Sequence, residues 1–176
     1  MSCEVMLDLE TLSTRSNAVI LVIAAVKFNR TKGVVEEPEF YRHIDIDSCK
    51  AVGLTTDDIT IKWWNQQSEA VRNEAFGGVR LPLYNVLKEF RTWYGNNVSN
   101  IWCQGANFDI PILDEAYKRC KIESPWKFWE VRDTRTLYDV AKFRQKDLQR
   151  KGDNHNALHD CRHQISCVVE SFRKIK

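Results

Sequence analysis

The chain has 176 residues, of which 43% are hydrophobic and 28% charged, and its formal net charge is +2. This length suits one domain over residues 1–176, and so small a net charge does not by itself predict binding to nucleic acid. The longest apolar stretch, residues 18–26, is too short to span a bilayer, so we expect no membrane association. Six cysteines are scattered without a C-x-x-C pair, which favours a reduced, cytoplasmic protein.

The first part of the chain is predicted to form a three-stranded antiparallel meander. Apolar runs at residues 5–9 and 18–28 indicate neighbouring buried strands, and alternation at residues 40–46 indicates a third. Three helices are then predicted, at residues 60–67 with Thr60 as the cap, at 68–76 with Ser68 as the cap, and from Pro82 to the Gly95 stop.

The second part alternates between strands and helices. The patterns predict a strand at 100–104, a helix from Asn107 or Asp109 to about 120, a short strand at 128–131, a helix at 134–143, a mobile polar loop at 144–156 and an amphipathic helix at 158–173. A meander followed by alternating elements describes an α/β fold, with helices flanking a mixed sheet.

Two acidic residues interrupt the first predicted strand. Asp8 and Glu10 are two residues apart, so their side chains leave the same face of the strand. An acid in an apolar strand costs free energy unless it is paired or binds a cation, and two on one face favour a divalent metal. The sequence leaves open the alternative of two strand-end acids that point into solvent.

Two further acids lie near predicted helix starts. Asp109 follows the strand 100–104, which places it at the carboxyl end of the sheet, where ligands of α/β proteins gather. Taken alone, it is more typical of a helix N-cap. Asp160 lies one turn into the last helix, where the helix dipole stabilises an acid whatever its role. His155 precedes that helix in a Gly-Asp-Asn loop, where an exposed histidine without function is common.

The order and context of these residues resemble a known family. The segments 8–11 (Asp-Leu-Glu-Thr), 107–109 (Asn-Phe-Asp) and 155–160 (His-Asn-Ala-Leu-His-Asp) look like the three exonuclease motifs of the DnaQ-like DEDDh 3′-5′ exonuclease superfamily. The third motif, H-x-A-x-x-D, is the most specific of them. The resemblance spans residues 8–160 and implies a ribonuclease H-like fold.

Two more segments narrow the resemblance. Residues 59–68 and 127–136 are similar to segments of phage exonuclease A and of a related mycobacterial exoribonuclease, and the chain is also similar to prophage proteins labelled exodeoxyribonuclease VIII-like. Many DEDDh enzymes carry Thr-Thr-Gly after the glutamate, whereas this chain has Thr11-Leu12-Ser13. Leu12 is bulkier than the threonine that it replaces, at the place where the family packs the 3′-terminal base.

The resemblance implies phosphodiester hydrolysis with two Mg²⁺ or Mn²⁺ ions. These hard cations prefer carboxylate and water ligands, and two ions about 3.5–4 Å apart activate a water and neutralise the phosphoryl group. By resemblance, Asp8, Glu10 and Asp160 hold the first ion, Asp8 bridges to the second, and Asp109 orients the second. His155 is expected to take the proton from the attacking water, which suits its ordinary pKa of about 6.5.

Other polar and aromatic residues are open to two interpretations. Asn107 either hydrogen-bonds the scissile phosphate or caps its helix. Trp63 and Trp64 either stack on bases or fill the core. Arg132 and Arg135 either grip phosphates or form an ion-pair cluster around an acid. We take as candidate substrate-binding residues Thr11, Leu12, Trp64, Asn107 and Arg132.

The expected substrate is single-stranded nucleic acid, with DNA favoured over RNA, digested from the 3′ end to nucleoside monophosphates. Residues 118–151 hold eleven Lys and Arg against five Asp and Glu, which is typical of a phosphate-facing surface or of a solvated helix face. An exoribonuclease and a catalytically silent nucleic-acid-binding module are the alternatives, and five filled catalytic positions argue against the silent one. The sequence leaves a homodimer open.

Overall fold

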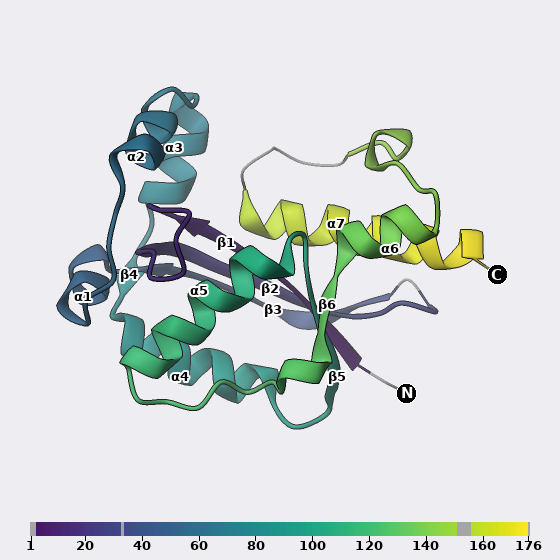
Figure 1. The fold of residues 1–176 in the computed structure, drawn as a ribbon, viewed down its shortest axis with the longest axis horizontal. Coiled ribbons are helices and arrows are strands. Elements are labelled where there is room, and N and C mark those ends of the chain that lie inside the picture. Colours follow the sequence, from purple (N-terminus) through teal and green to yellow (C-terminus); the bar gives the residue numbers. More distant parts are fainter. Residues whose placement is uncertain (1–2, 33, 151–155, 176) are drawn as a thin grey trace.

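A computed structural model describes residues 3–32, 34–150 and 156–175, which fold around a six-stranded sheet in the order β4-β3-β2-β1-β5-β6 (Figure 1). The antiparallel meander consists of β1 (Cys3–Thr11), β2 (Ile20–Asn29) and β3 (Val34–Ile44). Parallel strands extend it on both sides, with β5 (Val98–Cys103) and β6 (Val131–Asp133) beyond β1 and β4 (Arg80–Leu81) beyond β3. The predicted α/β class, mixed sheet and three-stranded meander are therefore confirmed.

Helices cover both faces of this sheet (Figure 1). On one side are α4 (Leu83–Tyr94) and α5 (Ala106–Arg119), and on the other are α6 (Thr134–Val140) and α7 (Ala157–Ile175), which packs on β1 and β2. Three short helices connect β3 to β4, namely α1 (Ile46–Ala51), α2 (Asp58–Asn65) and α3 (Glu69–Phe76). Within the described parts of the chain, no helix is long and apolar enough to cross a bilayer.

Burial explains which strands and helices could be predicted from the hydrophobic pattern of the sequence. Residues 20–26 of β2 are almost completely buried because this strand lies between β1 and β3 with helices on both faces, so it forms a continuous apolar run. In α4 the five buried residues follow the predicted helical spacing. Gly95 ends that helix with a positive φ of 70°, which glycine adopts more readily than other residues.

Two boundaries differ from the prediction because aspartates cap the helices. The third strand ends at Ile44, two residues before the predicted end, because the Asp45 side chain accepts a hydrogen bond from Ser48 N at 2.7 Å and starts α1. Helix α2 is capped by Asp57 and not by Thr60, whose backbone N–H donates to Asp57 at 2.8 Å. The predicted cap of α3 by Ser68 is confirmed.

The second half of the chain differs from the prediction in three places. Residues 128–130, predicted to belong to a strand, form a 3₁₀ turn, η1 (Phe128–Glu130), and the strand follows it. A second turn, η2 (Gln145–Asp147), lies within the predicted loop 144–156. Helix α5 begins at Ala106 after a Gly105 N-cap, so neither Asn107 nor Asp109 caps it. His155, the predicted general base, and the other residues at 151–154 of the predicted loop lie outside the described residues.

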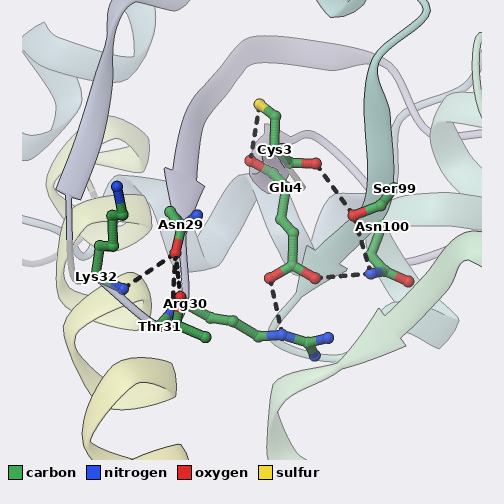
Figure 2. Close-up of polar contacts among 8 residues, drawn as sticks. All are labelled: Cys3, Glu4, Asn29, Arg30, Thr31, Lys32, Ser99 and Asn100. Carbon is green, nitrogen blue, oxygen red and sulfur yellow. Dashed lines mark hydrogen bonds and ion pairs between the residues drawn. The ribbon is translucent and has the colours of Figure 1, made fainter. Parts of the chain in front are cut away.

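Glu4 shows how this fold accommodates a buried acid with a structural role. It is fully buried at the start of β1, where Asn100 Nδ2 donates to its Oε1 at 2.7 Å and Arg30 Nε lies 3.4 Å from its Oε2 (Figure 2). Arg30 also lies over the ring of Phe172, 4.7 Å from the ring centroid. A cation and an amide within the protein thus compensate the charge of Glu4, which ties β1 to β5 and to the end of β2.

Candidate active site

Three carboxylates from two elements converge near the other end of β1. Asp8 and Glu10 leave the same face of the strand, as their spacing predicts, and Asp160 comes from the first turn of α7. Oxygens of the three side chains lie within 4.8 Å of one another, and all three residues are partly buried. This spacing allows all three to bind one cation.

Asp109 reaches the same place from a third element. The turn between β5 and α5 depends on Gly105, whose φ is 103° and where a Cβ would lie 2.8 Å from Arg135 Nη1. Asp109 is 3% exposed, and its Oδ1 accepts a hydrogen bond at 3.2 Å from Leu9 N, between the two acids of β1. The helix-cap interpretation of Asp109 is therefore wrong, and a fourth carboxylate lies beside the other three.

The crowding of these acids changes their protonation. Burial, and then the negative charges of Asp109 and Glu10, raise the pKa of Asp8 well above its usual range. Burial, and then the charge of Asp109, raise the pKa of Glu10 to about 8. Burial raises the pKa of Asp109 to about 7. Near neutral pH such a site attracts protons or a cation, and its all-oxygen donor set fits a hard divalent ion.

Two polar residues that the sequence analysis missed contact these acids. Gln164 is 5% exposed, and its Nε2 donates to Asp8 Oδ1 at 3.1 Å. It follows Asp160 by four residues, so helical spacing could have identified it. The guanidinium of Arg150 forms an ion pair with Asp160. That contact joins residues ten positions apart in the sequence, and no local pattern predicts it.

Two cavities of opposite character adjoin the carboxylates. The first, of about 530 Å³, is polar, and we call it the polar cavity. Its walls are Asp8, Gln104, Gln145, Lys146, Leu148, Arg150, Asp160, His163 and Gln164. The second, of about 370 Å³, is mainly apolar, and we call it the apolar cavity. Its walls are Leu9, Glu10, Thr11, Thr14, Ile59, Thr60, Trp63, Trp64 and Phe108.

The two tryptophans of α2 have different surroundings. Trp64 is 2% exposed, and its Nε1 donates to Thr11 O at 2.8 Å, so most of this ring is in the core. Trp63 is 38% exposed on the wall of the apolar cavity, with its ring centroid 4.9 Å from that of Trp64. Trp63 is therefore better placed than the predicted Trp64 to stack on a base.

The remaining candidate substrate-binding residues differ in their surroundings. Thr11 lines the apolar cavity, but its hydroxyl donates to Ser13 O at 2.7 Å. Leu12 is 6% exposed and belongs to the hydrophobic core. Asn107 is exposed in the first turn of α5. Arg132 donates from Nη1 to Trp129 O and to Val131 O, at 2.7 and 2.8 Å, and its contact with substrate stays a prediction.

The two histidines near the start of α7, His159 and His163, also have different surroundings. His159 is partly exposed on the helix. His163 lines the polar cavity with Asp8 and Asp160, and its Nε2 lies 3.6 Å from Cys167 Sγ. Burial, and then the charge of Arg150, lower the pKa of His163.

Comparison with known proteins identifies the family. Over residues 3–172 the chain matches the model of a family described as the 3′-5′ exoribonuclease Rv2179c-like domain. The chain belongs to this family. It is therefore a 3′-5′ exonuclease, and the predicted resemblance to DnaQ-like DEDDh enzymes is confirmed. The catalytically silent module that the sequence left open is not supported.

Individual relatives agree with this assignment. The chain is 29% identical to an exodeoxyribonuclease of Enterobacteria phage T4, over 95% of this chain and 88% of the relative. E. coli exonuclease I, solved in complex with a dA16 oligonucleotide, has the same fold, with a TM-score of 0.69 at 14% identity. That match covers 94% of this chain but only 40% of exonuclease I. The nuclease domain of 3′hExo, a DEDDh family member bound to rAMP, matches with a TM-score of 0.64 and 13% identity, over 98% of this chain and 92% of that domain.

Proposed function

We propose that this exonuclease removes nucleoside monophosphates from the 3′ end of single-stranded DNA, with two Mg²⁺ or Mn²⁺ ions held by its four clustered carboxylates. The observation that carries the proposal is the convergence of Asp8, Glu10 and Asp160 within 4.8 Å, beside the buried Asp109. Metal-assisted hydrolysis of a phosphodiester needs cations close to the phosphoryl oxygens, and the carboxylate oxygens of this cluster lie close enough together to hold one.

The carboxylates have separate roles in this proposal. Two divalent ions, when bound, neutralise charge on the phosphoryl group and lower the pKa of the attacking water. Asp8, Glu10 and Asp160 would hold the first ion, because their oxygens already converge. Asp8 would also contribute to holding the second ion, together with Asp109 from the start of α5. The amide of Gln164 fixes the orientation of Asp8 through its hydrogen bond to Oδ1.

His155 acts in this proposal as the general base that accepts the proton of the attacking water. Support comes from the H-x-A-x-x-D spacing, in which the last residue, Asp160, belongs to the cluster. The residue lies two positions before the first residue of α7, Ala157. An imidazole with a pKa near 6.5 is neutral and able to accept a proton at physiological pH.

The apolar cavity receives the 3′-terminal nucleoside in this proposal. Glu10 and Trp63 both line it, so a base stacked on Trp63 would place its sugar and phosphate near the carboxylates. Aromatic stacking tolerates any base and requires an unpaired strand, which supports a single-stranded substrate. Thr11, which lines this cavity, and Asn107, two residues before Asp109 in α5, stay candidates for contacts to this nucleotide.

The choice between DNA and RNA has support on both sides. The phage T4 relative, which aligns over 95% of this chain, is named an exodeoxyribonuclease, and this supports DNA. The family description names an exoribonuclease, so trimming of RNA is the second candidate function. Proteins distinguish the two polymers mainly at the sugar 2′-hydroxyl.

Matched oligomers test both parts of the proposal. Single-stranded DNA and RNA of the same sequence, labelled at the 5′ end, are incubated with the protein and Mn²⁺. We expect a descending ladder for both polymers or for DNA alone, with the higher kcat/KM on DNA. A higher kcat/KM on RNA would establish the exoribonuclease instead. Cleavage of a closed circular single strand would contradict exonucleolytic digestion.

A further inference from the structure

The positive charge of Arg150 lies next to the carboxylate cluster. Its guanidinium is paired with Asp160, and the two side chains are only 27% and 18% exposed. Arg150 also lines the polar cavity, together with Asp8 and Asp160. The position differs from that of Arg30, which stabilises an acid far from the cluster.

A divalent cation and Arg150 compete for the same carboxylate. An ion bound by Asp8, Glu10 and Asp160 would withdraw negative charge from Asp160 and would repel the nearby guanidinium. By thermodynamic linkage, the ion weakens the Arg150–Asp160 pair by the same factor by which the pair weakens the binding of the ion. The pair therefore lowers the metal affinity of the free protein.

The polar cavity offers the displaced guanidinium a second partner. Gln145 Nε2 donates to Gln104 Oε1 at 2.5 Å, which fastens η2 to the end of β5 and keeps this wall of the cavity beside the carboxylates. Lys146 contributes a second positive charge to the same wall. A guanidinium forms paired hydrogen bonds with phosphate oxygens, so an arginine released here is matched to the backbone of a nucleic acid strand.

We propose that Arg150 is a counter-ion that the divalent cation displaces from Asp160, and that it then binds a backbone phosphate of the single strand in the polar cavity. The inference rests on the proposed function for its ligand, a phosphodiester strand. It makes metal and strand bind cooperatively, because the ion releases the group that holds the strand. The structure assigns this role to Arg150 and not to Arg144, whose partner is Asp147.

The first test measures metal binding in the absence of nucleic acid. Mn²⁺ is titrated into wild-type protein, Arg150→Gln and Arg144→Gln by calorimetry or by the electron paramagnetic resonance of free Mn²⁺. We expect Arg150→Gln to bind Mn²⁺ about 5- to 10-fold more tightly than wild type, within the usual range of coupling between two sites. Arg144→Gln, which removes the same charge from the same segment, should bind as wild type does. Equal or weaker Mn²⁺ binding by Arg150→Gln would overturn the proposal.

The second test measures strand binding. A fluorescent DNA oligomer with a hydrolysis-resistant phosphorothioate 3′ end is titrated with each protein, in chelator and in saturating Mn²⁺. In wild type Mn²⁺ should strengthen strand binding both through the ions and through the released Arg150, so Arg150→Gln should show a smaller gain than wild type. Arg150→Lys keeps the charge without the planar fork, so we expect near-normal Mn²⁺ affinity with weakened strand binding. An undiminished gain in Arg150→Gln would contradict the role in the strand.

These measurements distinguish a counter-ion role for Arg150 from a purely structural one. They also distinguish failure of this inference from failure of the proposed function. A purely structural anchor would lower the Tm of Arg150→Gln and leave its Mn²⁺ affinity unchanged, which would overturn the proposal. Wild-type protein that fails to trim single strands would refute the proposed function, whereas the Mn²⁺ titration would still decide whether Arg150 competes with the metal.

Discussion

At the scale of single residues, Glu4 and Asp8 belong to the same strand and lie four residues apart, but their charges are compensated differently. Glu4 has Arg30 and Asn100 as partners at one end of β1. Asp8 shares its surroundings with other acids, and burial together with those acids raises its pKa. At this end Arg150 compensates only part of the negative charge, and a divalent cation would compensate the remainder.

The raised pKa values predict how the stability of the metal-free protein depends on pH. The folded-state pKa values, about 8 for Glu10 and about 7 for Asp109, exceed the ordinary values of 4.5 and 3.8. The folded protein therefore binds more protons than the unfolded chain, so this contribution to stability is complete below pH of about 4 and is lost as pH rises through about 8. Thermal unfolding in chelator should show Tm falling across this window. Excess Mn²⁺ should reduce the fall, and a Tm that rises with pH in chelator would contradict the assignment.

The general base is tested by replacing His155. We expect His155→Ala to lower kcat by roughly 10²–10⁴ and to flatten the acidic limb of the pH–rate profile, because the titrating base is gone. Mn²⁺ affinity should change little, since the carboxylates are intact. His159→Ala is the matched control on α7. Near-normal activity of His155→Ala together with an inactive His159→Ala or His163→Ala would overturn the DEDDh assignment of the base.

At the scale of elements, α2 connects the core to the apolar cavity through neighbouring tryptophans. The indole of Trp64 holds α2 to the end of β1 by its hydrogen bond to Thr11 O. Trp63, one residue earlier, lines the apolar cavity with Glu10. The same helix therefore carries one residue that packs in the core and one that we propose contacts the substrate.

Substitutions in α2 should separate these two roles. We expect Trp64→Ala to destabilise the protein by about 3–5 kcal/mol, because a large core side chain and its hydrogen bond are lost. Trp63→Ala should leave Tm almost unchanged and raise KM for single-stranded DNA about 5- to 150-fold, the equivalent of about 1–3 kcal/mol for one stacked base. Thermal unfolding and steady-state kinetics of both variants provide the measurement. The opposite pattern would place Trp64 and not Trp63 against the substrate.

Strands and helices could be predicted where their buried residues form a continuous or periodic hydrophobic pattern in the sequence. The apolar run of β2 and the buried stripe of α4 match the structure closely. Helix α1 was missed because it is six residues long and depends on one aspartate cap. Strand β4 was missed because its two residues are defined by pairing with β3, not by a pattern of their own.

At the scale of the whole molecule, the site is assembled from β1, α5 and α7, which are far apart in the sequence (Figure 1). The pairing of Asp8 with Glu10 could be predicted from their spacing, and Gln164 follows Asp160 by one helical turn. The contact between Asp109 and Leu9 joins residues 100 positions apart, so no local pattern contains it. The resemblance to the DEDDh motifs predicted that Asp109 belongs to the site, which residue spacing alone left open.

The most direct measurement of the central claim is the trimming of a 5′-labelled single strand by Asp8→Asn in Mn²⁺. Asp8 belongs to the convergent carboxylates and is proposed to serve both ions, so its loss should lower kcat/KM about 10³-fold or more. Tm in chelator should be maintained or raised, because one buried like charge is removed. Asp139→Asn, at an exposed position of α6, should trim as wild type does. A descending ladder from Asp8→Asn at the wild-type rate would contradict the account.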